Sequence, residues 1–161
     1  MRTKTELLTE QINYRKAGMN MAKTAVVYWS GTGNTEQMAQ AVAEGAKSAG
    51  AECDLIQASD FDESMLPSLT GIAFGCPAMG AEQLEETEFE PMWEAVSGKL
   101  GGKRIALSGS YGWGDGEWMR TWESACADNG ISLVCESVIC ADAPDDGAAA
   151  ECRNLGAAIA K

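Results

Sequence analysis

The stretch TAVVYWSGTGNT, from Thr24 to Thr35, decides the fold of this 161-residue chain. Its first half, Thr24–Trp29, is a run of apolar, β-branched and aromatic residues, which is typical of a buried parallel strand. Its second half is polar and contains two glycines, and it opens a helical pattern over Asn34–Ala49 that ends at Gly50. The sequence therefore predicts a strand, a loop and a helix in immediate succession.

Strands and helices alternate along the rest of the chain. Further strands are predicted at Glu52–Gln57, Gly71–Cys76, Arg104–Gly109 and Ser132–Ile139. Further helices are predicted at Phe89–Val96, Glu117–Asn129 and Ala148–Ala160. This alternation predicts one α/β domain, a doubly wound five-stranded parallel sheet in the common order 2-1-3-4-5 with helices on both faces. Such sheets bind ligands beyond the carboxyl ends of their strands.

Composition and charge exclude several classes of function. With 24 acidic and 12 basic residues the net charge is −12, so nucleic acid and membrane surfaces are poor partners. The chain contains no histidine, which rules out Ser–His and Cys–His catalysis and imidazole metal sites. Residues 1–20, unlike the rest of the chain, carry a net positive charge. We expect them to be a tail, or an artefact of an early start codon, ahead of a domain over residues 21–161.

Cysteine usage and hydropathy predict a cytoplasmic protein. The six cysteines form no C-x-x-C pair and no metal-type spacing, which favours free, buried thiols over a disulfide framework. The longest uncharged stretch, Ser64–Ala81, contains proline and glycine and does not predict a membrane span. The N-terminal segment lacks the apolar region of a signal peptide.

The loop Ser30–Thr35 is the first candidate for a binding site. It follows a strand and opens a helix, so its backbone N–H groups and the helix dipole favour an anion. It lacks the lysine of a P-loop, and Glu36 stands where a dinucleotide fingerprint has its third glycine. Phosphate binding is the favoured interpretation, and a polar loop with a helix cap is the alternative.

Two further loops leave the third and fourth strands. The loop Cys76–Glu82 carries Met79 beside Gly80, a pair that by itself indicates packing more often than binding. The loop Ser110–Gly116 places Trp113 among glycines, which suits a backbone that approaches a flat ligand and an aromatic ring that stacks on it. A surface turn with a half-buried tryptophan is the alternative.

The three loops are expected to converge. They leave strands that are neighbours in the predicted order, so together they would offer an anion cradle, a thioether and an aromatic face in one crevice. A ligand with a phosphate at one end and a planar ring at the other matches this crevice. Flavin mononucleotide (FMN) fits that description.

From Met21 to Lys161 the sequence resembles the short-chain flavodoxins, in particular the clostridial type of anaerobic bacteria. The matching motifs are Val27–Glu36 for the family's phosphate loop, Ala78–Gly80 for its second loop, Glu85–Pro91 for the acidic segment that follows, and Gly109–Gly116 for its third loop. Residues 1–20 lie outside the resemblance.

This resemblance implies an FMN site on the three loops. The implied residues are Ser30, Gly31, Thr32, Gly33, Asn34, Thr35, Pro77, Ala78, Met79, Gly80, Ala81, Glu82, Ser110, Tyr111, Gly112, Trp113 and Gly114. The first loop would bind the phosphate, Trp113 and Met79 would cover the two faces of the ring, and Glu82 would accept a hydrogen bond from N3. The peptide between Gly80 and Ala81 would turn over on reduction, and glycine tolerates the positive φ that such turns require.

The resemblance also implies the function. The chain is expected to be an electron carrier and not an enzyme. It would be a monomer with a low reduction potential, and its non-covalently bound FMN would alternate between the semiquinone and the hydroquinone. Its partners would be basic-faced redox proteins, such as flavodoxin or ferredoxin reductases and oxidoreductases. The sequence departs from the family pattern at two positions. Pro77 stands where relatives have a serine whose hydroxyl helps to bind the phosphate, and Ala81 stands where aspartate is common. These departures leave the reduction potentials and the FMN affinity open.

Acidic residues are expected to rim the same end of the sheet. They are Asp60, Asp62, Glu63, Glu82, Glu85, Glu86, Glu88, Glu90, Asp115 and Glu117. Their charges would lower the second reduction potential and steer a basic partner toward the flavin. An ordinary solvated surface is the alternative interpretation of this charge run.

Two other functions remain open at this point. An FMN-dependent NAD(P)H or quinone reductase on the same fold needs room for a second substrate, and about 140 residues after Met21 leave little to spare. A phosphate-binding regulatory domain without flavin would leave Trp113 without a role. A receiver-type domain also needs a lysine near its last strand, whereas Lys103 and Arg104 begin the fourth strand.

Overall fold

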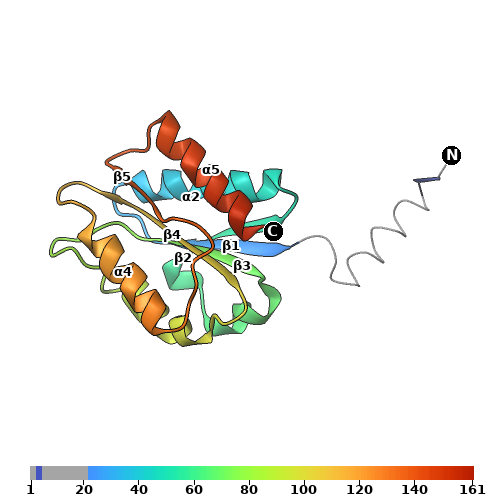
Figure 1. The fold of residues 1–161 in the computed structure, drawn as a ribbon, viewed down its shortest axis with the longest axis horizontal. Helices are drawn as coiled ribbons and strands as arrows, with labels where there is room; N and C mark the ends of the chain where they lie inside the picture. Colours follow the sequence, from blue (N-terminus) through green and yellow to red (C-terminus); the bar gives the residue numbers. More distant parts are fainter. Residues whose placement is uncertain (1–2, 5–21) are drawn as a thin grey trace.

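A computed structural model describes residues 3–4 and 22–161. It contains a five-stranded parallel sheet in the order β2-β1-β3-β4-β5 (Figure 1), which confirms the predicted fold class. The strands are β1 (Lys23–Tyr28), β2 (Glu52–Gln57), β3 (Gly71–Gly75), β4 (Arg104–Tyr111) and β5 (Val138–Ala141). The expectation for residues 1–20 falls outside the described residues, apart from residues 3–4.

The helices α2 to α5 cover the two faces of the sheet (Figure 1). Helices α2 (Asn34–Ser48) and α5 (Asp146–Ile159) pack together on one face, and α3 (Phe89–Val96) and α4 (Glu117–Asp128) lie on the other. Each layer encloses its own cluster of buried apolar side chains. Within the described ranges, no helix has the length and apolar character needed to cross a membrane.

The segment between β2 and β3 departs from the predicted alternation. It contains the 3₁₀ helices η1 (Ala58–Asp60) and η2 (Glu63–Ser68) and no α-helix. The Nζ atom of Lys103 donates hydrogen bonds to the carbonyls of Leu66 and Leu69, at 2.7 and 2.8 Å, and so fixes the end of η2. A third 3₁₀ turn, η3 (Ser97–Lys99), follows α3.

The register of the sheet brings the three candidate loops to one edge. Tyr28, the last residue of β1, is paired with Gly75, the last residue of β3. Gly75 is in turn paired with Ser108 of β4, and the carbonyl of Ser108 accepts a hydrogen bond from the amide of Cys76 at 3.1 Å. The loops that follow β1, β3 and β4 therefore begin side by side.

The fifth strand was predicted in the wrong place. The prediction was Ser132–Ile139, whereas the paired strand is Val138–Ala141. In the described segment before Val138, strand pairing with β4 is limited to an isolated bridge between Leu133 and Ile105. Strand β4 also continues two residues beyond the predicted Gly109, because β5 pairs with its C-terminal half from Ser108 to Tyr111.

Several close contacts between backbones require glycine. Helices α2 and α5 approach so closely that a Cβ atom on Gly156 would lie 1.9 Å from the carbonyl oxygen of Val42. A Cβ atom on Gly45 would lie 1.9 Å from the carbonyl oxygen of Arg153. On the other face of the sheet, a Cβ atom on Gly109 would lie 2.1 Å from the carbonyl oxygen of Cys76. These distances are far below van der Waals contact, so the spacing of α2 against α5 and the approach of Gly109 to Cys76 depend on the absence of a side chain at these positions.

Candidate functional site

The loop after β1 presents unpaired backbone donors. The Oγ atom of Ser30 accepts hydrogen bonds from the amides of Gly33 and Glu36, at 3.1 and 3.2 Å, and so holds the loop in a curve. Gly33 has a φ of 97° and caps α2. Within residues 3–4 and 22–161, the amides of Gly31, Thr32 and Thr35 have no hydrogen-bond acceptor. Free amides at a helix N-terminus suit a phosphate group.

These donors line a cavity of about 230 Å³ that is built from all three loops. The predicted site residues in its lining are Ser30, Gly31, Thr32, Asn34, Thr35, Pro77, Ala78, Met79, Ser110, Tyr111 and Gly112. The amide of Ser110 donates to Thr35 Oγ1 at 3.3 Å, so the first and third loops are joined directly. The structure thus brings these residues together.

Gly80 and Ala81 line a neighbouring cavity of about 460 Å³, which also contains Met79 and Trp29. The other predicted site residues, Gly33, Glu82, Trp113 and Gly114, line neither cavity.

Trp29 and Asp142 line the first cavity and were not among the predicted site residues. The indole of Trp29 packs on the first loop, because a Cβ atom on Gly31 would lie 3.0 Å from its Cη2 atom. The carbonyl of Asp142 accepts a hydrogen bond from Ser110 Oγ at 2.7 Å. Both residues directly follow strands at the same edge of the sheet, and this is the signal that could have identified them.

The second loop forms a tight turn from Met79 to Glu82. The amide of Glu82 donates to the carbonyl of Met79 at 2.7 Å, and the amide of Met79 donates to the carbonyl of Gln83 at 2.9 Å. In this conformation the positive φ, 56°, belongs to Glu82, whereas Gly80 lies outside the positive-φ region. A Cβ atom on Gly80 would meet nothing within 4 Å, so the turn has free space at the position where a peptide rotation was expected.

Glu82 holds one carboxylate oxygen ready for a donor. Its Oε2 atom accepts a hydrogen bond from the amide of Trp118 at 3.0 Å. Its Oε1 atom is buried and has no donor among the residues that the structure describes. Gly114 lies against this oxygen, since a Cβ atom there would be 1.9 Å away. A buried acceptor without a partner is costly, and the N–H of a bound ring is a donor of the required kind.

The third loop carries an exposed aromatic side chain. Trp113 is 66% exposed, whereas Trp118, five residues on, is fully buried. Trp113 and Gly114, which has a φ of 89°, belong to the segment that leads into α4. A large apolar ring left in water, on the loop whose Tyr111 and Gly112 line the first cavity, suits a platform for a flat ligand.

Comparison with known proteins identifies the family. The family model described as flavodoxin matches residues 26–156. The chain is 43% identical over 136 residues to the flavodoxin of Megasphaera elsdenii, a match that covers 84% of this chain and 97% of that protein. It is 45% identical over 135 residues to the flavodoxin of Clostridium beijerinckii, with coverage of 84% and 97%. The chain belongs to the flavodoxin family.

A solved flavodoxin structure agrees with this assignment. The solution structure of two-electron reduced M. elsdenii flavodoxin superposes with a TM-score of 0.78 at 42% identity, over 84% of this chain and 97% of the other. Flavodoxins are FMN-binding electron-transfer proteins that act with redox partner proteins. The expected resemblance and class of function are confirmed, and neither the reductase nor the regulatory domain is favoured.

The acidic surroundings of this flavodoxin's site differ from the prediction at two positions. Glu85 is only 3% exposed and is therefore not a surface charge. It accepts hydrogen bonds from the amides of Thr87, Glu88 and Phe89 and so caps the start of α3. Glu63 forms an ion pair with Lys99, which precedes β4, so it belongs to the opposite end of the strands.

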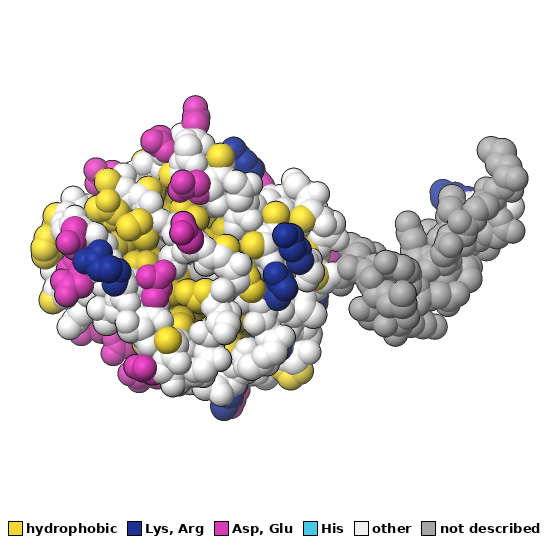
Figure 2. Space-filling view, viewed as in Figure 1, with side chains coloured by type: hydrophobic (Ala, Val, Ile, Leu, Met, Phe, Trp, Pro, Cys, Tyr) yellow, Lys and Arg dark blue, Asp and Glu magenta, His cyan; other side chains and the backbone are white. Residues whose placement is uncertain are grey.

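Three carboxylates do gather beside the third loop of the flavodoxin site. Glu82, Asp115 and Glu117 each offer an oxygen within 4.8 Å of the others. Asp115 is paired with Arg120 at 2.9 Å and the pair is exposed to solvent. Figure 2 shows one face of the molecule, on which magenta carboxylates are more widespread than dark-blue basic groups.

The six cysteines take no part in the flavodoxin site. All six are free thiols, four of them buried and two half-buried, as the sequence predicted. Burial raises the pKa of every one, and it raises the pKa of Cys76, Cys126 and Cys152 to about 12. A thiol with a raised pKa is a poor nucleophile, so these groups act in packing.

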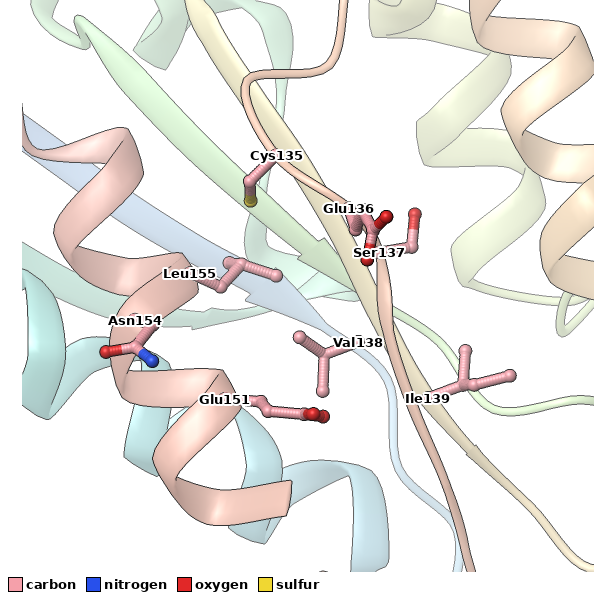
Figure 3. A pocket seen from close by; sticks show the side chains of 8 residues that line it. All are labelled: Cys135, Glu136, Ser137, Val138, Ile139, Glu151, Asn154 and Leu155. Carbon is pink, nitrogen blue, oxygen red and sulfur yellow. The ribbon is translucent and has the colours of Figure 1, made fainter. Parts of the chain in front are cut away.

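A separate cavity of about 440 Å³ lies between α5 and the segment that leads into β5 (Figure 3). Val138 and Leu155 extend toward it from its two walls, and Glu136 and Glu151 lie at its margin. It shares no residue with the three loops, so it is not part of the flavodoxin site.

Proposed function

We propose that this protein is a low-potential one-electron carrier whose FMN is held non-covalently by the three loops. The observation that carries the proposal is the convergence, at one edge of the sheet, of free loop amides, an unpartnered buried carboxylate oxygen and an exposed tryptophan. Bound FMN supplies a ring system that accepts electrons singly.

The amides of Gly31, Thr32 and Thr35 bind the phosphate, with the hydroxyls of Ser30, Thr32 and Thr35 as additional donors. Pro77 lines the same cavity and contributes no donor, so the first loop must supply the phosphate contacts. Trp113 and Met79 exclude water from the faces of the ring, and Glu82 accepts the N3 proton through Oε1. The amides of Gly112, Trp113 and Gly114 remain available for the ring's pyrimidine edge.

The carboxylates beside the third loop favour a low potential. An added negative charge near Glu82, Asp115 and Glu117 is repelled by groups that already carry like charge. The apolar surfaces of Met79 and Trp113 weaken its solvation further. Both effects would disfavour the build-up of negative charge on a ring bound beside these residues, and so would favour a low potential.

The negative charge of this protein also indicates what kind of redox partners it meets. We infer that they present basic faces and meet this protein, a monomer, in the cytoplasm, since free thiols suit a reducing compartment. At a net charge of −12 the attraction is long-ranged and is screened by salt. Electron transfer to a basic acceptor protein should therefore slow steadily between about 0.01 and 0.5 M ionic strength. Stopped-flow rates that stay flat over that range would contradict steering.

Reconstitution followed by stepwise reduction tests the proposal. FMN should bind the apoprotein about 100-fold or more tighter than riboflavin, which lacks the phosphate that the loop amides contact. Anaerobic reductive titration should then pass through a long-wavelength absorption band at half reduction. Equal affinity for the two flavins would contradict the phosphate site. Bleaching in one two-electron step would contradict the carrier role and favour a reductase.

A further inference from the structure

A groove between α3 and α4 adjoins the flavin loops and shares Glu82 with them. Its volume is about 450 Å³, and one end is formed by Glu82 and Leu84, directly after the Met79–Glu82 turn. From there it extends along the two helices as far as Ser97 and Asn129. Anything bound in this groove would therefore lie next to the second loop.

One wall of the groove is a row of unpaired carboxylates. Glu86, Glu90 and Glu94 follow one another at intervals of four residues, and the last two lie on the same face of α3. None of the three has a cationic partner among the described residues, whose exposed ion pairs form elsewhere. Glu90 and Glu94 are like charges four residues apart on one helix, an arrangement that repels and that a bound cation would relieve.

The floor of the groove is apolar and aromatic. The rings of Trp93, Trp118 and Trp122 are buried beneath it, and Leu84 and Ala125 are half-buried at its surface. The indole N–H of Trp122 has no acceptor in the part of the chain that the structure describes. A carboxylate wall above an apolar floor matches a side chain with a long aliphatic stem and a cationic head.

We propose that this groove is the docking site for a basic segment of the electron-transfer partner. Lysine or arginine heads lie along Glu86, Glu90 and Glu94, and their stems pack on Leu84 and Ala125. A second copy of this chain is a poor occupant, because both copies carry a net charge of −12. The proposal rests on the proposed function, since occupation of the groove brings the partner beside the flavin loops.

The test uses the FMN-loaded, ¹⁵N-labelled protein and a defined probe, a capped peptide of alternating lysine and alanine. Amide chemical-shift changes should concentrate at Glu94, Thr121 and Ala125, and they should diminish as salt is added. Changes centred on α2 or α5, or spread evenly over the surface, would overturn the proposal. Chemical-shift changes in the groove that depend on protein concentration in the absence of peptide would show that a second copy of this chain binds there, and would overturn the proposal.

A matched pair of double variants separates the groove from net charge. Glu86→Gln/Glu94→Gln removes two charges from the groove, and Glu44→Gln/Glu151→Gln removes two exposed charges from α2 and α5. The first should weaken peptide binding about tenfold and the second less than about twofold. Equal weakening would show that only total charge matters and would overturn the proposal.

The flavin spectrum of each sample distinguishes the two hypotheses. If FMN binds normally but the peptide does not bind in the groove, the docking proposal is overturned and the proposed electron-carrier function is unaffected. If the unmodified protein does not bind FMN, the proposed function itself fails.

Discussion

Replacing Gly156 by alanine should destabilise the protein by about 3 kcal/mol, because the added methyl group has no room. The new methyl group would lie 1.9 Å from the carbonyl oxygen of Val42 and 2.8 Å from the amide nitrogen of Ala46. Both atoms belong to the backbone of α2 and cannot move aside as a side chain could. The helices must therefore separate, which opens the packed layer between them.

Gly147 provides the matched control for this prediction, because it lies in the same helix. A Cβ atom there would meet only Asp145 Oδ1, at 3.5 Å, an ordinary contact. Gly147→Ala should leave stability unchanged or raise it by about 0.5 kcal/mol, since alanine restricts the unfolded chain. Urea unfolding of both variants at a fixed FMN excess measures the difference. Similar stabilities for the two variants would contradict the close helix contact.

Replacing Glu85 by glutamine should cost about 2–3 kcal/mol at pH 7. The carboxylate accepts hydrogen bonds from the amides of Thr87, Glu88 and Phe89 and from the hydroxyl of Thr87. Glutamine removes the charge and turns an NH₂ group toward these donors. The start of α3 and the acidic segment before it would both loosen.

The pH dependence gives this prediction a second readout. Burial raises the pKa of Glu85, but the hydrogen bonds from Thr87, Glu88 and Phe89 outweigh it and leave the pKa below its ordinary value. A lowered folded-state pKa means that the stabilisation is complete above the ordinary glutamate pKa of about 4.3 and is lost as the pH falls toward the folded value. The stability gap between wild type and Glu85→Gln should therefore shrink below about pH 4.

Urea unfolding across this pH range, with Glu44→Gln as the exposed control, measures the effect. The control should stay within about 0.5 kcal/mol of wild type at every pH. A gap between wild type and Glu85→Gln that persists unchanged into acid would show that the carboxylate charge is not the cause.

Most of the fold was predictable. The central strands β1 and β3 are buried almost throughout, as their largely apolar sequences indicate. Strand β2 was predicted residue for residue, and β1 and β3 to within one residue. The segment Ser132–Ile139 failed, because its β-branched residues indicate a strand while pairing depends on where β4 lies beside it. Register with a neighbouring strand is a tertiary property that local sequence does not contain.

The candidate site was predictable where glycines and polar groups cluster after a strand. Trp29 was missed because its position at the end of an apolar run is typical of core packing, although it lines both cavities. Glu85 was misplaced for the opposite reason: a glutamate within an acidic run indicates solvent, whereas this one is buried by the helix start that it caps. In both cases the environment is set by residues distant from the local pattern.

The contacts at Gly45, Gly109 and Gly156 divide the molecule into parts with different tolerance for redesign. These glycines fix the spacing between helices and strands through backbone atoms alone, so the frame of the fold is indifferent to most side chains in the three loops. A library that varies only exposed loop residues such as Thr32, Ala81 and Trp113 would sample new ligands while keeping the glycines and hydrogen bonds that hold the loops. The same number of substitutions spread over α2 and α5 would unfold the protein before a new ligand site could be selected.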